Sequence, residues 1–206
     1  MWDEQCGINF PLLYVSSIYL YLYAKKNNID TFFFATRDCC HWVKIFKKLF
    51  PEENAIYFDC SRNMLDGATK EANKYYDEYV LKCLKTTSDK VIFVDIHGTG
   101  KRIFSYFETK YGEDKVPYNF LLSSSYTKYE EFPSITQKYL EKGKFINIVF
   151  GAKGTPIEML NYDKQGTLQT YDMNGPVRDK PEYAIKFLEP YHVCVKYMRS
   201  EEHTSE

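Results

Sequence analysis

The sequence lacks an excess of either charge, paired metal-binding cysteines and any long hydrophobic run. Its formal net charge of -1 leaves no overall basic field, so nucleic acid is not an expected partner. The 6 cysteines form no CxxC pair and no zinc-ligand spacing, which predicts separate thiols in a reducing compartment. The most apolar stretch, residues 10–24, is interrupted by Ser16 and Ser17 and is too short to span a bilayer. We therefore expect a cytoplasmic protein with neither a signal peptide nor a transmembrane segment.

The sequence does contain enough apolar side chains for a complete core. Hydrophobic residues make up 44% of its 206 residues, which is typical of a globular domain. Apolar runs that predict β-strands recur along the chain at residues 30–36, 55–60, 91–94, 116–122 and 145–150. Segments with helical spacing of apolar residues separate these runs. The pattern predicts an α/β fold, a doubly wound and mostly parallel sheet of about five strands with a helical N-terminus and a helical insert.

One domain is expected to span residues 1–198, followed by a frayed tail at 199–206. The helix predicted within residues 10–24 is apolar nearly all round, which is typical of a helix that is buried or lies under another element. Residues 64–90 are highly charged and predict a peripheral, lid-like helical insert rather than part of the core. Residues 151–198 predict an irregular C-terminal extension with a helix near its end.

The most informative stretch begins with the strand at residues 91–94, which leads directly into Asp95. A loop of small residues follows, and then a helix from Arg102 that ends at Gly112. A glycine-containing turn that leads into a helix N-terminus presents unpaired N–H groups and a partial positive charge to an anion. The alternative is a tight turn that binds nothing, since many α/β domains contain one.

Polar loops follow three of the predicted strands, at residues 36–38, 61–63 and 95–101. Because the carboxyl ends of parallel strands lie along one edge of a sheet, these loops are expected to converge there. Arg37 and Arg62 in two of these loops suit a phosphate or pyrophosphate group. The alternative is that each arginine pairs with a nearby surface carboxylate.

Two nucleotide-binding motifs are excluded by spacing. A P-loop requires a glycine five residues before the Gly100–Lys101 pair and a serine or threonine after it, but Asp95 and Arg102 occupy these positions. The dinucleotide fingerprint G-x-G-x-x-G is absent.

The motif of haloacid-dehalogenase-like phosphatases is incomplete in this chain. Such an enzyme requires an aspartate nucleophile after its first strand, within D-x-D, but Thr36 stands there, two residues before Asp38. Ser61 matches the hydroxyl of that family's second strand. Phosphoaspartate chemistry is therefore not available to this chain.

Residues 91–102 resemble the ribose-phosphate loop of type I phosphoribosyltransferases, in which four apolar residues precede two acids and a Thr-Gly turn. The resemblance places Asp95 under the ribose hydroxyls. It implies that a loop of five residues wraps the 5-phosphate: His97, Gly98, Thr99, Gly100 and Lys101. Thr99 would contact the phosphate through its hydroxyl, and the other residues through backbone N–H groups. The sequence departs from the family at two points. Ile96 stands where the family has its second acid, and the loop is shorter by one residue.

The chain as a whole resembles a narrower group of such domains, encoded in bacterial capsule and O-antigen gene clusters. Their motifs G-P, F-L-x-R-D-G, Y-x-x-S-R and V-D-x-G-x-x-G correspond in order and approximate spacing to residues 10–11, 34–38, 57–62 and 94–100. Cys39 replaces the usual glycine after Arg-Asp. The resemblance implies transfer of 5-phosphoribosyl from phosphoribosyl pyrophosphate (PRPP) to a sugar hydroxyl of a glycan or glycolipid, with release of pyrophosphate. It also implies a location at the membrane periphery and a separate phosphatase partner.

The resemblance also assigns residues to the chemistry. The residues expected around the pyrophosphate are Thr36, Arg37, Ser61 and Arg62. Mg²⁺ is the implied cofactor, and Asp95 would contact it indirectly, through the ribose or water. Asp38 and then Glu158 are the candidate general bases, and residues 151–198 are the candidate acceptor side. The alternatives are a phosphatase relative without its nucleophile and a non-catalytic module that binds phosphate or nucleotide.

Overall fold

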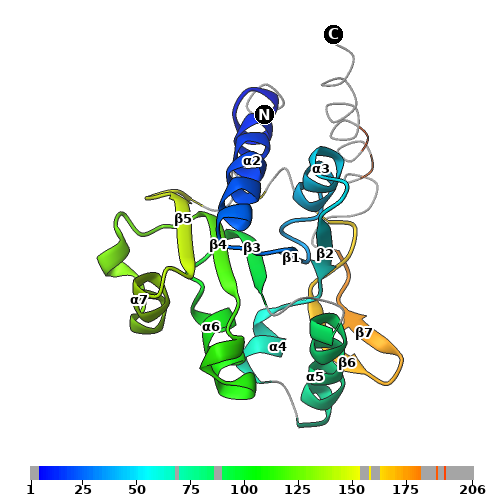
Figure 1. Ribbon diagram of the computed structural model, residues 1–206. Helices are drawn as coiled ribbons and strands as arrows, with labels where there is room; N and C mark the ends of the chain where they lie inside the picture. The colour runs from blue at the N-terminus through cyan, green and yellow to red at the C-terminus, as the bar shows by residue number, and fades with distance from the viewer. Residues whose placement is uncertain are drawn as a thin grey trace.

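The computed structural model describes residues 5–67, 70–85, 90–153, 158, 163–181, 189 and 193. In this part of the chain, five parallel strands form one sheet in the order β2-β1-β3-β4-β5 (Figure 1). The strands are β1 (Thr31–Ala35), β2 (Asn54–Phe58), β3 (Val91–His97), β4 (Tyr118–Ser123) and β5 (Phe145–Val149). The predicted α/β class, the parallel sheet and the helical N-terminus are confirmed.

Helices cover both faces of the sheet. Their bounds are α2 (Phe10–Lys26), α3 (Trp42–Leu49), α4 (Arg62–Asp66), α5 (Lys70–Lys85), α6 (Lys101–Tyr111) and α7 (Ser134–Glu141). A π-helical turn precedes α2, and two 3-10 turns lie further along: η1 (Gln5–Asn9), η2 (Glu113–Lys115) and η3 (Tyr129–Glu131). Figure 1 shows α2 and α3 on one face and α4, α5 and α6 on the other. The arrangement is the layered one expected of a doubly wound sheet.

The position of strand β1 inside the sheet explains why its sequence is a continuous apolar run. Alternate side chains point to opposite faces of the sheet, and both faces are covered. Phe34 packs edge-on against Trp42 of α3, with ring centroids 5.8 Å apart. Phe33 faces the opposite layer and stacks on Phe58 of β2, at 4.5 Å. All five residues of β1 are buried.

The strand order reverses between β1 and β3. The chain leaves β1 for β2 on one side, and then crosses to β3 on the other side of β1. Where the order reverses, the loops after the two strands diverge and leave a crevice at the carboxyl edge, which is the usual ligand site of such sheets. The loops after β1 and β3 are therefore the expected ligand-binding loops of this fold.

Helix α2 corrects one expectation. Its buried side includes Leu13 and Leu20, whereas Val15 and Leu22 on the other side are 62% and 59% exposed. Of the two expectations for this helix, that it is buried or that it lies under another element, full burial is therefore wrong. A serine is accommodated on the buried side because the Ser17 hydroxyl donates to Leu13 O at 2.8 Å and accepts from Trp42 Nε1 at 3.0 Å.

Helix α5 contradicts a second expectation. Residues 64–90 were predicted to lie outside the core, but Tyr76 and Val80 of α5 are fully buried. Tyr79 packs against Phe58 of β2, with ring centroids 5.5 Å apart. The helix is amphipathic, so its many charges leave one side free to cover the sheet.

The C-terminal region contains structure that the sequence did not predict. Strands β6 (Leu168–Asp172) and β7 (Gly175–Arg178) form an antiparallel hairpin where an irregular extension was expected. The helix predicted near the end of residues 151–198 lies largely outside the described residues, as does the tail at 199–206. Within the described ranges, no helix combines the length and apolar character needed to cross a membrane.

Candidate functional site

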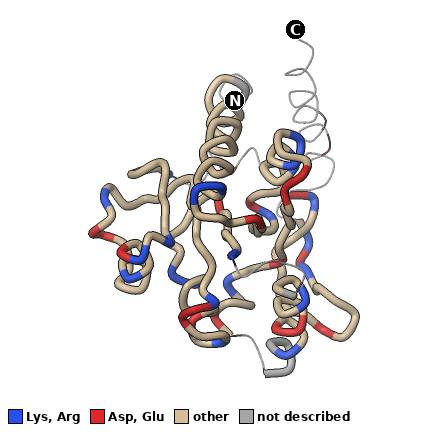
Figure 2. The backbone as a smooth tube through the Cα atoms, viewed as in Figure 1, with Lys and Arg blue, Asp and Glu red and all other residues tan. Residues whose placement is uncertain are grey.

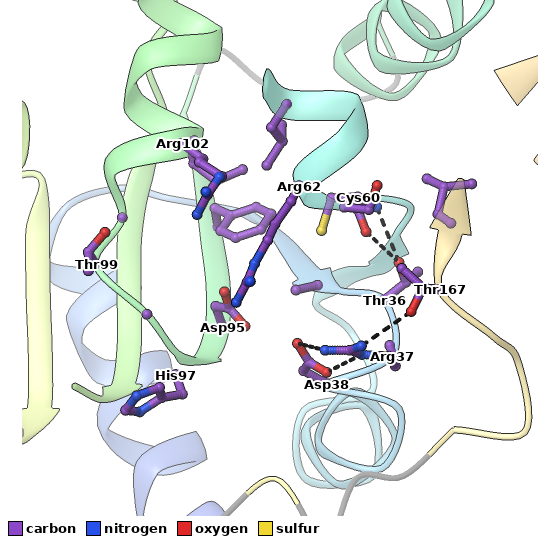
Figure 3. Close-up of a pocket in the computed structure, with 18 of the residues that line it drawn as sticks. Thr36, Arg37, Asp38, Cys60, Arg62, Asp95, His97, Thr99, Arg102 and Thr167 are labelled. Atoms are coloured by element: carbon purple, nitrogen blue, oxygen red, sulfur yellow. Dashed lines mark hydrogen bonds and ion pairs between the residues drawn. The ribbon is translucent and has the colours of Figure 1, made fainter. Parts of the chain in front are cut away.

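A cavity of about 590 Å³ lies at the carboxyl ends of β1, β2 and β3 (Figure 3). Every residue that the sequence placed in a site contributes to its lining: Thr36, Arg37, Asp38, Ser61, Arg62, Asp95, His97, Gly98, Thr99, Gly100, Lys101 and Glu158. The volume is within the range of small-molecule sites. The structure thus brings together residues that are up to 122 positions apart in the sequence.

The loop after β3 takes its shape from glycine. Gly100 is the N-cap of α6 and has a φ of 72° in the left-handed region, which glycine adopts without steric cost. A Cβ at this position would lie 3.1 Å from Phe104 and 3.2 Å from Phe145. Gly100 has no side chain with which to cap the helix. The Thr99 hydroxyl accepts from Lys101 N at 3.3 Å, and the other N–H groups of the first turn of α6 remain available at the cavity.

Asp95 lies at the floor of this loop. Its Oδ1 accepts a hydrogen bond from its neighbour's backbone, Ile96 N, at 2.8 Å. Its Oδ2 faces Gly98, since a Cβ built there would be 3.8 Å away. Burial, and secondly the charge of Asp38, raise the pKa of Asp95 well above its usual range. A cation or hydrogen-bond donors brought by a ligand would therefore favour its ionised form.

Ile96, which stands where the resembling family has a second acid, is fully buried. Successive residues of a strand point to opposite faces, so this side chain is directed away from the cavity face that Asp95 occupies. Asp95 is therefore the only carboxylate that β3 presents to the cavity.

The loop after β1 is held by many polar contacts. Arg37 Nε donates to Asp38 Oδ1 at 2.8 Å, and its Nη1 donates to Thr167 Oγ1 at 3.3 Å. The Arg37 backbone has a φ of 71°, and its N–H donates to the Tyr57 hydroxyl at 2.6 Å. For Arg37 the structure therefore shows the alternative stated above, in which an arginine pairs with a nearby carboxylate.

Arg62 and Lys101 differ from Arg37. Among the described residues, neither charged group has an ion pair or hydrogen-bond partner, whereas neighbouring Arg102 pairs with Asp66 at 2.7 Å. Figure 3 shows the Arg62 side chain extended toward Asp95. These two cations, one from α4 and one from α6, are available to an anion in the cavity.

The surroundings of His97 favour one neutral tautomer of its ring. The Ser123 hydroxyl donates to the carbonyl of Ile96 at 2.8 Å, so its oxygen can only accept from His97 Nδ1, 3.0 Å away. This contact fixes the proton on Nδ1 and leaves Nε2 as an acceptor. Burial lowers the pKa of His97, which favours the same neutral form.

Thr36 and Ser61 are engaged with the backbone. The Thr36 hydroxyl donates to Cys60 O at 3.3 Å and accepts from Cys60 N at 3.2 Å, and so ties the end of β1 to that of β2. The Ser61 hydroxyl caps α4 by accepting from Met64 N at 3.3 Å. Both residues line the cavity, and both shape the loops that carry its arginines.

The hairpin β6–β7 forms a wall of the cavity that sequence reasoning missed. Gln169 and Arg178 line the cavity from this side. Arg178 forms an ion pair with Asp59 beyond the end of β2, and the Tyr171 hydroxyl donates to the same carboxylate at 3.2 Å. A sequence signal was present, since Asn174 and Gly175 lie at the turn and Asn-Gly is a strong short-range hairpin signal, although the two loop residues are Met173 and Asn174.

The residues present fit a magnesium ion that a ligand mainly holds. The described residues include no group of three or more His, Cys, Asp or Glu side chains that could hold a metal. Mg²⁺ in phosphate-transfer sites is commonly bound through one or two carboxylates together with substrate phosphates and water. The Asp95 carboxylate, with Oδ2 toward the loop, suits such a role.

No protein-family model, curated protein or solved structure matches this chain. The function is therefore argued from the geometry of the cavity and from the motifs in its loops.

Proposed function

We propose that the protein is a phosphoribosyltransferase that moves 5-phosphoribosyl from PRPP to a sugar hydroxyl of a glycan, with release of pyrophosphate. One arrangement carries the proposal: the carboxylate of Asp95 lines the same cavity as Arg62 and Lys101, two cations without partners among the described residues, beside the N-terminus of α6. A phosphorylated sugar has anionic groups for the cations and hydroxyls for the carboxylate.

Each part of the donor has a matching group in the cavity. The first turn of α6 and Lys101 are assigned to the 5-phosphate, because free N–H groups and a lysine favour a dianion. Asp95 accepts hydrogen bonds from the ribose hydroxyls. Arg62 and Arg37 are assigned to the pyrophosphate, which they reach from the ends of β2 and β1. Mg²⁺, when bound, supplies positive charge that offsets the charge on the departing pyrophosphate.

The observed ion pair between Arg37 and Asp38 links donor binding to the candidate general base. When Arg37 turns to the pyrophosphate, Asp38 loses its partner and can accept the proton of the attacking hydroxyl. The acceptor oxygen then bonds to C1 of the ribose as the C1–O bond to pyrophosphate breaks. Glu158, which also lines the cavity, is the second candidate for this role.

The hairpin β6–β7 is proposed as the acceptor side, since it forms the wall opposite the α6 loop. A glycan or glycolipid acceptor implies work on the cytoplasmic side of a membrane, at its periphery. The product would retain the 5-phosphate, so a separate phosphatase is the proposed partner.

Binding of PRPP with Mg²⁺ tests the proposal directly. A ligand that binds only the folded protein at 100 times its Kd stabilises it by about 2.7 kcal/mol, which a thermal unfolding assay detects readily. We expect such a shift with PRPP and release of pyrophosphate when acceptor glycans are added. Absence of any shift at saturating PRPP would contradict the proposal.

A second candidate is a non-catalytic module that binds phosphate or nucleotide. The Arg37–Asp38 ion pair favours it, because it occupies the first candidate base in the structure as observed. Such a module would bind PRPP without releasing pyrophosphate, even by slow hydrolysis. A phosphatase relative is less well supported, because Thr36 replaces its nucleophile and bonds to the Cys60 backbone.

A further inference from the structure

The backbone of Arg37 adopts a conformation that its residue type disfavours. Among the described residues, only Arg37 and Asn28 are non-glycine residues with positive φ, at 71° and 54°. Asparagine tolerates the left-handed region because its short polar side chain can bond locally, but arginine has no such compensation. Something outside the residue must therefore hold Arg37 in place.

The Tyr57 hydroxyl is one such group. It accepts the N–H of Arg37 at 2.6 Å and donates its own proton to Asp163 Oδ2. Both bonds use the same oxygen, so the orientation of the phenol depends on Asp163. Burial raises the pKa of Tyr57, which keeps it protonated and able to donate.

The segment that carries Asp163 also reaches the side chain of Arg37. Thr167, four residues further along and directly before β6, accepts from Arg37 Nη1 at 3.3 Å. The loop after β1 is thus contacted at its backbone, through Tyr57, and at its guanidinium by one stretch, residues 163–167. This stretch leads into the hairpin that closes the cavity.

We infer that Tyr57 and Asp163 are positioning residues that hold Arg37 in the left-handed conformation from which its guanidinium lines the cavity. The role in ligand binding rests on the proposed function, whereas the role in loop conformation does not. A pre-set arginine loses less conformational freedom when an anion binds, which gives a reason for maintaining the strain.

Tyr79 provides a matched control. Its hydroxyl accepts a backbone N–H, that of Asp59, at 2.8 Å, directly after the neighbouring strand β2. Tyr79 is likewise partly buried, but Asp59 has no positive φ and does not line the cavity. Tyr57→Phe and Tyr79→Phe therefore remove the same kind of bond, and only the first removes it from Arg37.

Hydrogen exchange tests the inference without any ligand. In Tyr57→Phe, and in Asp163→Ala, we expect the amides of the peptide spanning residues 35–41 to exchange at least about tenfold faster than in the unmodified protein. In Tyr79→Phe this peptide should exchange at the unmodified rate. Equal exchange in this peptide for the two tyrosine variants would overturn the inference, whatever their melting temperatures.

A double-mutant cycle with PRPP as the probe tests the role in binding. We expect Tyr57→Phe to weaken PRPP binding about tenfold in the unmodified background. In Arg37→Gly, which needs no support at positive φ and has no guanidinium to place, the same change should weaken it less than about twofold. A merely structural role for Tyr57 would produce equal losses in both backgrounds and would contradict the inference.

The two experiments separate the inference from the proposed function. If the unmodified protein does not bind PRPP, the proposed function fails, but faster exchange near Arg37 in Tyr57→Phe and Asp163→Ala still supports the conformational role. If PRPP binds and exchange near Arg37 is unchanged in these variants, the proposed function stands and the inference fails.

Discussion

The loops after β1 and β3 flank the same cavity but are built in opposite ways. In the β1 loop a non-glycine residue, Arg37, adopts a positive φ and its charge is paired with Asp38. In the β3 loop a glycine, Gly100, adopts the positive φ, and the charge of the next residue, Lys101, is not paired by any residue that the structure describes. The charge of the β1 loop is thus paired within the protein, whereas the β3 loop presents a lysine charge that no described residue pairs.

The difference indicates two ways to prepare an anion site. Glycine gives the β3 loop its shape at little steric cost, and the first turn of α6 and the Lys101 ammonium group remain for a ligand, although the N–H groups of Gly98 and Lys101 bond within the protein. The β1 loop is shaped by contacts from distant residues, so its arginine is already placed but must exchange partners to bind. Figure 2 shows the positions of lysines and arginines, in blue, and of aspartates and glutamates, in red, on several elements along the backbone.

The largest expected effect comes from replacing the glycine of the β3 loop. Gly100→Ala combines a disfavoured φ with contacts of 3.1 Å and 3.2 Å to two buried rings, those of Phe104 and Phe145. We expect a loss of about 3 kcal/mol in unfolding free energy, measured by denaturant titration. Gly143→Ala is the control, because its φ of 68° is similar but nothing lies within 4 Å of the added Cβ. Equal losses would show that packing against the rings is not limiting.

Removing the unpaired cations should reduce binding without reducing stability. Arg62→Ala and Lys101→Ala are each expected to weaken PRPP binding by about tenfold to a hundredfold, measured by titration calorimetry. Arg102→Ala should have a smaller effect, since Asp66 already pairs with Arg102 at 2.7 Å on the surface. A larger loss for Arg102→Ala than for the other two would contradict the assignment of the free cations.

Asp95→Asn should stabilise the protein while impairing its activity. Because the folded state raises the pKa of Asp95, it retains a proton that the unfolded chain has released, and this stabilisation is lost as pH rises through the folded pKa. Asparagine avoids that loss. We expect a rise in melting temperature on the order of 2–4 °C at pH 8, as about 1 kcal/mol produces in a chain of this size, and little change near pH 4.

The control for this change is Asp66→Asn, because Asp66 is exposed and outside the cavity lining. It should show no gain in melting temperature at pH 8. A lower melting temperature for Asp95→Asn at that pH would contradict the raised pKa.

The smallest expected effect isolates the strain in the β1 loop. Arg37→Gly and Arg37→Ala remove the same ion pair with Asp38, but only alanine retains the steric penalty at positive φ. We expect the glycine variant to be more stable than the alanine variant by about 1 kcal/mol in denaturant unfolding. If the alanine variant is as stable as the glycine variant, the β1 loop has relaxed to a negative φ at residue 37.

Local sequence patterns predicted much of the fold. The apolar runs at residues 30–36 and 91–94 located β1 and the start of β3, because burial on both faces requires nearly every side chain to be apolar. The buried sides of α2 and α5 were not predicted correctly. An apolar helix surface becomes buried only where another element covers it, and the sequence alone does not show which side that is.

The candidate site divides in the same way. The sequence by itself determined the Gly100 turn, Asp95 and the arginines after β1 and β2, because strand-end chemistry is local and parallel strands share one carboxyl edge. Only the tertiary structure decided that Arg37 is paired, that Arg62 and Lys101 have no partner within the described ranges, and that residues 163–167 contact the β1 loop. The contacts of residues 163–167 join residues more than 100 positions apart, which no local pattern records, and the Arg37–Asp38 pair depends on the backbone conformation that the β1 loop adopts.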